Sequence, residues 1–358
     1  MVKKKVVLIG DHVVGHIRQC EAIYYHIVEY YKRRKAIDDG AELLSLQLNT
    51  KIQPGWIKKA IHYFLHPRHA ECEGCDRCVR MITSPDDYRR LLKVSPDIVV
   101  SSFGKRTTLI TRWLARRCRA KSIVLMNPRQ FQERYDLVVI PRHDVVEAKP
   151  NMVVTEGAPN AVRLRALSPA ALSLRNEFGQ SKTCRIGLLL GGDYKTFRMQ
   201  EEKIDVLIRQ VREVAGILNA ELFITTSRRT PRSIERAVKF CFTGESSCRL
   251  LVIASENNRP EVVPALLGLC RLVLVSPESI SMISEAATSD AHVLVYEDDD
   301  FLDDKHRRFL ANLKTKGFIH TESINRIAQK ILEVSRLPAK EKSLNDGEAV
   351  LEGLSRIL

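Results

Sequence analysis

Residues 186–193 read IGLLLGGD, a short apolar run that ends on two glycines and an aspartate. An apolar run of this length with a glycine turn behind it is typical of a strand that is buried on both faces. Stretches with helical periodicity lie on either side of it, at 168–178 and 203–218. A strand between two amphipathic helices predicts a βαβ unit and therefore a parallel sheet.

The same alternation of short apolar runs and helical stretches continues along the whole chain. Strands are predicted at 5–9, 42–46, 97–100, 122–125, 137–139 and 152–155, and again at 186–190, 221–225, 250–253, 272–275 and 292–295. Helices are predicted at 17–32, 107–119, 168–178, 203–218, 231–240, 261–269, 281–287 and 323–336.

We therefore predict an α/β protein of two Rossmann-like domains whose parallel sheets face a cleft. The N-terminal domain is expected to span residues 1–165, a linker helix 166–183, and the C-terminal domain 184–358. A last short helix is a candidate to fold back across the domain boundary. Because open α/β sheets bind ligands at the carboxyl ends of their strands, the cleft is the expected site.

The composition is that of a globular protein, with 44% hydrophobic and 28% charged residues among 358. No stretch approaches the roughly 18 apolar residues of a membrane-spanning helix. The apolar run after the N-terminal lysines is too short for a signal peptide, so we expect a cytoplasmic protein. The formal net charge of +14 indicates an acidic partner. Because no nucleic-acid-binding motif is present, a phosphate-rich substrate or the inner membrane surface is favoured over nucleic acid.

Three predicted strands of the C-terminal half end in polar loops. The first loop contains Gly191 and Gly192, whose backbone amides could bind a diphosphate. The second contains Ser227, Arg228 and Arg229 directly before a helix, and a helix N-terminus with arginines is a good anion site. The alternatives are a plain glycine turn and a capped helix with arginines that face solvent.

The third loop opens a helix and carries Ser279, Ser281 and, one turn further, Glu285. A carboxylate at this place could accept both hydroxyls of a ribose, as acidic residues do in dinucleotide folds. The alternative is that a serine caps the helix and Glu285 completes a capping box. Three such loops in consecutive βα units favour a bound ligand over three separate caps.

With these loops the chain resembles the mitochondrial-fission ELM-type family, which is named for a plant member and has many bacterial relatives. The resemblance covers nearly the whole chain and rests on GG at 191–192, TSRRTP at 226–231, SISMISEA at 279–286, GHIRQ at 15–19, PR at 128–129, DLVVIPRHD at 136–144 and TEGAPN at 155–160. It departs from the family at GDHVVGH (10–16), where Asp-Gly-x-Pro-Gly-His is expected, and at PES (277–279), where an Asp-Ser pair is usual.

The resemblance implies a fold similar to GT-B glycosyltransferases. The glycine loop and the Ser/Glu helix start also resemble those of the glucosaminyltransferase that makes lipid II, in which such a glutamate holds the ribose of a uridine diphosphate sugar. GT-B enzymes generally need no bound metal, so we expect no cofactor for catalysis.

The N-terminal half is expected to bind the acceptor. His16 follows the first strand and is our candidate for the base that takes the proton of an acceptor hydroxyl, although His12 competes for this role and a helix-capping histidine is the plainer alternative. Arg129 and His143 end two later strands and could bind an acceptor phosphate or carboxylate, or belong to ordinary polar loops.

A cysteine cluster lies in a predicted insertion near residues 62–80, with His69, Cys72, Cys75 and Cys78 spaced three apart. Three cysteines and a histidine suit a structural zinc, and three such cysteines also suit an iron–sulfur cluster with a further ligand. Reduced thiols in a loop are the alternative. Nearby, residues 56–65 mix aromatic residues with lysines, which fits either a helix that touches lipid headgroups or an amphipathic helix that faces the core.

These features together predict a glycosyltransferase that moves a sugar from a nucleotide-diphosphate donor to a surface glycan or a lipid-linked acceptor, with peripheral contact to the inner membrane as an option. A nucleotide-sugar epimerase shares the architecture, and a non-catalytic membrane-associated adaptor agrees with the family's name. The sequence leaves both alternatives open.

Overall fold

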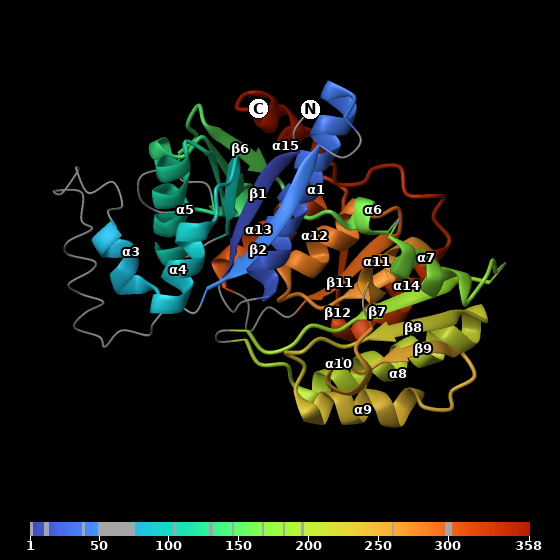
Figure 1. The fold of residues 1–358 in the computed structure, drawn as a ribbon. Helices are drawn as coiled ribbons and strands as arrows, with labels where there is room; N and C mark the ends of the chain where they lie inside the picture. The colour runs from blue at the N-terminus through green and yellow to red at the C-terminus, as the bar shows by residue number, and fades with distance from the viewer. Residues whose placement is uncertain are drawn as a thin grey trace. The chain divides into compact units, whose positions relative to one another are not determined.

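The computed structural model describes residues 3–10, 14–37, 40–48, 76–102, 105–128, 132–144, 147–166, 168–181, 183–194, 197–259, 261–297 and 303–358. The chain forms two compact units (Figure 1). The first comprises Met1–Thr155, Pro159–Ala161 and Asp346–Leu358, and the second comprises Glu156–Ala158 and Val162–Asn345.

The first unit contains a six-stranded parallel sheet with the strand order β2-β1-β3-β4-β5-β6. Its strands are β1 (Lys4–Gly10), β2 (Ala41–Gln47), β3 (Ile98–Ser101), β4 (Lys121–Leu125), β5 (Leu137–Pro141) and β6 (Met152–Thr155). Its helices are α1 (Val14–Lys35), α3 (Asp76–Ile82), α4 (Pro85–Lys93), α5 (Lys105–Cys118) and α15 (Asp346–Ser355), with short 3-10 helices η2 (Gln132–Arg134) and η3 (Arg142–Asp144).

Alternate residues of β1 belong to two different cores, because successive side chains of a strand point to opposite faces. Val6 and Leu8 lie in the core that contains the apolar residues of α1 and α15. Val7 and Ile9 lie in the core that contains those of α3, α4 and α5. Helices therefore cover both faces of the sheet, which explains why its strands read as nearly continuous apolar runs.

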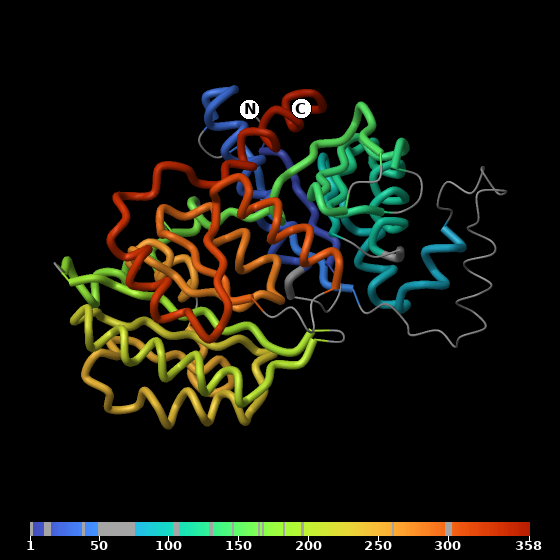
Figure 2. The backbone as a smooth tube through the Cα atoms, turned by 180° about the vertical axis from the view of Figure 1, so that it is seen from behind, coloured from blue at the N-terminus to red at the C-terminus, as the bar shows by residue number. Residues whose placement is uncertain are grey.

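The last helix, α15, belongs to the first unit, whereas the predicted C-terminal domain continues to residue 358. Val350, Leu351 and Leu354 form an apolar face that is buried in the core with α1. A side chain at Gly353 would come within 2.3 Å of Val153, so the helix lies close against β6. Figure 2 shows this final segment, in red, beside the N-terminal helix.

The second unit contains another six-stranded parallel sheet, in the order β12-β11-β10-β7-β8-β9. Its strands are β7 (Arg185–Leu189), β8 (Glu221–Thr225), β9 (Cys248–Val252), β10 (Leu272–Val275), β11 (His292–Glu297) and β12 (His320–Ser323). Its helices are α6 (Val162–Arg165), α7 (Pro169–Asn176), α8 (Glu201–Leu218), α9 (Arg232–Phe242), α10 (Ala254–Asn257), α11 (Val262–Leu269), α12 (Ile280–Thr288), α13 (Asp304–Thr315), η4 (Ile324–Arg326) and α14 (Ile327–Ser335).

In this sheet the order in which strands are added reverses between β7 and β10. It runs outward from β7 through β8 to β9, then crosses back so that β10 pairs with the opposite edge of β7. Such a topological switch point is where open α/β sheets bind ligands, at the carboxyl ends of the strands. The equivalent point of the first sheet lies between β1 and β3.

The predicted fold class is confirmed, and each predicted strand is present within two residues of its expected ends. β12 and α13 were not predicted. β12 has the sequence HTES, in which only Thr321 is buried, so it lacks the apolar signal of a strand. Within the described part of the chain, no helix is both long and apolar enough to cross a membrane.

Candidate functional site

The three loops singled out in the sequence lie next to one another at the carboxyl edge of the second sheet. β7 pairs with β10 on one side and with β8 on the other, with Leu189 opposite Val275 and Thr225. The ladder continues into the loops, since the Leu190 amide donates to the Thr225 carbonyl at 2.9 Å and the Ser276 amide donates to the Leu189 carbonyl at 3.2 Å. The sheet topology thus brings all three loops to the switch point.

Both glycines of the first loop are required by close contacts with the neighbouring loops. A Cβ atom on Gly192 would lie 2.1 Å from the carbonyl oxygen of Arg229 and 2.4 Å from the amide nitrogen of Thr230. A Cβ atom on Gly191 would lie 1.7 Å from Oε1 of Glu278. Loop-to-loop packing therefore explains the two glycines without a ligand.

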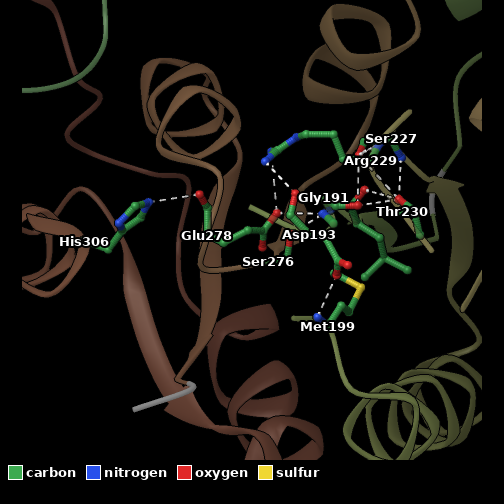
Figure 3. A network of polar contacts seen from close by, with 11 residues as sticks. Gly191, Asp193, Met199, Ser227, Arg229, Thr230, Ser276, Glu278 and His306 are labelled. Atoms are coloured by element: carbon green, nitrogen blue, oxygen red, sulfur yellow. Dashed lines mark hydrogen bonds and ion pairs between the residues drawn. The ribbon is translucent and has the colours of Figure 1, made fainter. Parts of the chain in front are cut away.

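The two glycine amides, which the sequence analysis treated as available to a diphosphate, both have partners within the protein (Figure 3). The Gly191 amide donates to Oγ of Ser276 at 2.7 Å, and the Gly192 amide donates to Oε1 of Glu278 at 2.8 Å. An incoming anion that used these amides would have to replace the Ser276 hydroxyl at Gly191 and the Glu278 carboxylate at Gly192.

Ser227 braces the second loop against the first. Its hydroxyl donates to the Gly191 carbonyl at 2.9 Å and accepts from the Arg229 amide at 3.1 Å, while its carbonyl accepts from the Thr230 amide at 3.0 Å. Thr230 also donates from its hydroxyl to the Gly191 carbonyl. Arg228, between them, is exposed to solvent.

The Arg229 guanidinium spans the loops. One nitrogen donates to the Asp193 carbonyl at 3.3 Å, and another lies 3.8 Å from Oε1 of Glu278. The guanidinium carbon is 5.4 Å from the centre of the Tyr194 ring, which is within cation–π range. Because 41% of the Arg229 side chain is exposed, it can still contact a ligand from solvent.

Glu278 was not among the predicted site residues, and it is the most unusual side chain of the cluster. The side chain is 0% exposed, and its Oε2 atom has no hydrogen-bond partner among the residues that the structure describes. Burial raises the pKa of this carboxyl group above its ordinary value, against the opposing effects of the Gly192 amide and Arg229. Its signal in the sequence is an acidic residue directly after a buried apolar strand.

His306, in the first turn of α13, was also missed. Its Nε2 lies 3.1 Å from the Glu278 carbonyl and its Nδ1 lies 2.6 Å from Oδ1 of Asp303, which also caps α13 through the His306 amide. The ring lies edge-on to Tyr194, with centroids 5.7 Å apart. The ring therefore ties the backbone of the third loop to α13.

At the start of α12 the structure does not form the capping box. Ser279 occupies the N-cap position, but its side chain makes no capping bond. The third helical residue is Met282, so Glu285 stands beyond the position that a capping-box partner takes. Glu285 is buried, with 8% of its surface exposed, while Ser281 is partly exposed.

The motif around Gly157 packs against α12 within the second unit. The Ala158 amide donates to Oγ of Ser284 at 2.9 Å, and a Cβ atom on Gly157 would lie 2.8 Å from the same oxygen. Ser284 in turn donates to the Ile280 carbonyl at 2.7 Å. Two sequence motifs that are far apart in the chain thus fix the helix that carries Glu285.

The candidate residues of the N-terminal half belong to the first unit. His16 is half-buried in the first turn of α1, after the carboxyl end of β1, and His143 is half-buried in η3, after β5. β3 and β4 lie between these two strands in the sheet. Near the β1/β3 switch point, the Ser102 hydroxyl donates to the side-chain oxygen of Gln19 at 2.9 Å. Arg129 lies outside the described residues, and the roles of all three stay predictions.

The predicted metal cluster falls mostly outside the described residues. This holds for His69, Cys72 and Cys75, and Cys78 is a half-buried cysteine in α3. Over the described ranges, the structure contains no group of three or more side chains that could hold a metal ion. A structural zinc or iron–sulfur cluster stays a prediction.

Several solved structures share this fold. The putative UDP-N-acetylglucosamine 2-epimerase of Listeria monocytogenes is 12% identical, with 99% of this chain and 96% of that chain covered and a TM-score of 0.59. The UDP-GlcNAc 2-epimerase of Neisseria meningitidis, solved with UDP-GlcNAc, is 13% identical with 98% of each chain covered and a TM-score of 0.55. MurG of Acinetobacter baumannii is 13% identical, with 99% and 100% covered and a TM-score of 0.50. The two sheets with their flanking helices match the fold of the two Rossmann-like domains of GT-B enzymes.

Sequence comparison gives the family. An uncharacterized protein of Rickettsia prowazekii is 21% identical over 295 residues, which is 69% of this chain and 81% of that protein. The family model described as mitochondrial fission ELM1 matches residues 15–348. Because this match spans nearly the whole chain, the protein belongs to the mitochondrial fission ELM1 family.

Proposed function

We propose that the second unit binds a nucleoside-diphosphate sugar at the carboxyl ends of β10, β7 and β8, and that the protein transfers the sugar to a hydroxyl group of a surface glycan or glycolipid. The observation that carries this proposal is the convergence of the three polar loops on the β7/β10 switch point. Solved neighbours of the same fold are described as complexes with UDP and with UDP-GlcNAc, which supports UDP and UDP sugars as the first ligands to try.

In this proposal the diphosphate binds near Gly191 and Gly192 and is contacted by Ser227, Arg228 and Arg229. The nucleoside lies along the start of α12. There, Ser279 and Ser281 offer hydroxyl groups, and the buried Glu285 accepts the two ribose hydroxyls. Its burial suits this role, because a carboxylate away from water forms stronger hydrogen bonds.

Transfer then needs a base for the acceptor and stabilisation of the leaving group. His16 takes the proton of the acceptor hydroxyl as its oxygen bonds to the anomeric carbon, and the bond from that carbon to the diphosphate breaks with its electron pair. The positive end of the α12 dipole and the loop arginines balance the charge on the departing diphosphate. Arg129 and His143 are proposed contacts of the acceptor.

Calorimetric titration with UDP, GDP and CMP tests the binding step. We expect UDP to bind, and Glu285→Ala to weaken binding by about tenfold or more, because it removes hydrogen bonds to a charged group. Glu213→Ala, an exposed carboxylate on α8, is the matched control and should leave the affinity unchanged. Failure of all three nucleotides to bind would reject the ligand, and an unchanged affinity in Glu285→Ala would reject the ribose contact.

Turnover of a UDP sugar distinguishes the remaining functions. UDP release that requires an added glycan or lipid acceptor indicates transfer, whereas turnover without an acceptor indicates an epimerase or a hydrolase. A protein that binds no nucleotide would fit the non-catalytic membrane adaptor. The cytoplasmic location and the peripheral membrane contact stay predictions.

A further inference from the structure

The Glu278 carboxylate occupies the position that the proposed function assigns to a phosphate. Oε1 accepts the Gly192 amide at 2.8 Å and lies 3.8 Å from the Arg229 guanidinium. These are an amide donor and a cation, the two kinds of group with which proteins bind phosphate. The protein therefore carries its own anion at the glycine loop.

This carboxylate is closely packed, but its hydrogen bonding is incomplete. The side chain is 0% exposed, and Gly191 has no room for a Cβ atom beside it, since that atom would lie 1.7 Å from Oε1. Yet Oε2 is buried and has no hydrogen-bond partner within the described part of the chain. A buried carboxylate oxygen without a partner costs folding free energy, so a purely structural glutamate should not persist in this form.

The side chain can leave while its backbone stays in place. The Glu278 carbonyl is held by His306 at 3.1 Å, and His306 is held by Asp303 at 2.6 Å. The carboxylate, by contrast, is held by the Gly192 amide, by Ser276 and by a longer ion pair with Arg229, on a side chain with three rotatable bonds. Displacement of the carboxylate therefore needs no refolding of the loop.

We infer that the Glu278 carboxylate competes with the phosphate of the ligand. In the absence of ligand the carboxylate binds the Gly192 amide and Arg229, and a nucleoside diphosphate displaces it on binding. The inference rests on the proposed function and adds a specificity to it. A ligand with a single carboxylate gains little binding free energy, because its carboxylate only takes the place of the Glu278 carboxylate. A diphosphate gains more, because it brings several anionic oxygens to the same donors.

Competition of this kind makes the affinity depend on pH. A proton on Glu278 removes the competing charge, so ligand affinity should rise as the pH falls. The charged and titratable groups around Glu278 are Arg229 from the loop after β8, Asp193 and Tyr194 from the loop after β7, and His306 with Asp303 from α13. Because these neighbouring groups are the same in both proteins, the difference between wild type and a Glu278 variant isolates the contribution of Glu278.

The test is calorimetric titration of the full-length protein with UDP-N-acetylglucosamine, whose diphosphate keeps its charge between pH 6 and 8. We expect Glu278→Gln, which keeps the shape and an acceptor for the Gly192 amide, to bind about tenfold more tightly than wild type at pH 8. The gain should shrink as the pH falls, because burial raises the pKa of Glu278 above its ordinary value. Glu221→Gln, at the opposite edge of the sheet, removes a similar charge and should leave the affinity unchanged.

The outcomes separate this inference from the proposed function. Equal affinity and equal pH dependence in wild type and Glu278→Gln would overturn the inference and leave the function intact. Weaker binding by Glu278→Gln would also overturn it, because Glu278 would then be a contact for a sugar hydroxyl. If neither protein binds the nucleotide sugar or UDP, and both are folded by circular dichroism, the inference and the proposed function fail together.

Discussion

The two edges of the second sheet differ in how the charged side chains there are hydrogen-bonded. At the amino edge, each nitrogen of the Arg185 guanidinium donates a hydrogen bond, to Glu221 at 2.7 Å and to the carbonyls of Gly179 and Phe178 at 2.9 and 2.8 Å. At the carboxyl edge, a buried oxygen of Glu278 has no hydrogen-bond partner among the described residues. Buried polar groups with partners are typical of a structural role, whereas a buried oxygen without one at a switch point is the feature on which our proposed ligand site rests.

A cavity elsewhere on the sheet has a different character. It has a volume of about 940 Å³ and lies at the amino edge, where three arginines and three glutamates are among its lining residues. Four of these charges pair with one another, Arg212 with Glu245 at 3.6 Å and Arg249 with Glu221 at 3.4 Å. Most charges of this hollow are therefore neutralised within the protein, and the contrast with Glu278 favours the carboxyl edge as the proposed ligand site.

The largest effect is expected at the amino edge, on stability alone. Arg185→Met should lower the free energy of unfolding by about 3 kcal/mol, because it leaves Glu221 and two carbonyls without their buried partner. Urea unfolding measures the loss, and the affinity for UDP should not change. Arg209→Met, exposed in the same cavity, is the control and should cost less than about 0.5 kcal/mol. A loss of UDP binding at unchanged stability in Arg185→Met would show that the amino edge has a binding role.

The sequence predicts most of this architecture but little of the chemistry that distinguishes the two edges. β7, β8 and β10 follow from their apolar runs, and the glycine loop follows from its position after β7. α13 was missed because its sequence, DKHRRFLANLKT, is dominated by charge, although Phe309, Leu310 and Leu313 are buried. Local patterns thus identify elements whose apolar residues outweigh the charged ones.

The contacts of the site could not be predicted, because they depend on which strands pair. Glu278 meets Gly192 across 86 residues of sequence, and only the crossover that places β10 beside β7 brings them together. His306 reaches the same loop from a helix that the sequence did not show. For the same reason the sequence could not show that the amides of Gly191 and Gly192 bond to Ser276 and Glu278, which lie in another βα unit.

Two glycine substitutions, one at each edge of the sheet, test the comparison of the edges through a smaller change in stability. Gly192→Ala should cost about 2 kcal/mol, because its Cβ atom would meet the backbone of Arg229 and Thr230 at 2.1 and 2.4 Å. It should also weaken UDP binding. Gly216→Ala, in α8 at the amino edge, has nothing within 4 Å of the added atom and should stabilise the protein by about 0.5–1 kcal/mol. Equal stability of the two variants in urea would contradict the tight packing of the three loops.

The smallest effect concerns the two ends of α12. Its start at the carboxyl edge has no side-chain cap, whereas its end is held by Lys340, whose Nζ donates to the carbonyls of Ala287 and Ser289 at 3.0 Å each. Ser343 adds a bond to the Ser289 carbonyl at 2.9 Å. Burial lowers the pKa of Lys340 from 10.5 to about 8.

The pKa of Lys340 fixes the sign of its pH dependence. Between about pH 8 and 10.5 the unfolded chain holds a proton on Lys340 that the folded protein has released, so the contribution of this residue to stability rises with pH in this window. The neutral amine still has two N–H groups for its two carbonyls. From pH 7.5 to 9.5, the free energy of unfolding in urea should therefore rise by roughly 1 kcal/mol more in wild type than in Lys340→Met, a figure reduced for partial exposure to solvent.

Only this difference between the two proteins is informative, because buried thiols such as Cys248, whose pKa burial raises to about 11, oppose the trend in both proteins. A constant difference across the two pH values would mean that Lys340 is solvated, and that the closed end of α12 is held by Ser343 and the backbone alone.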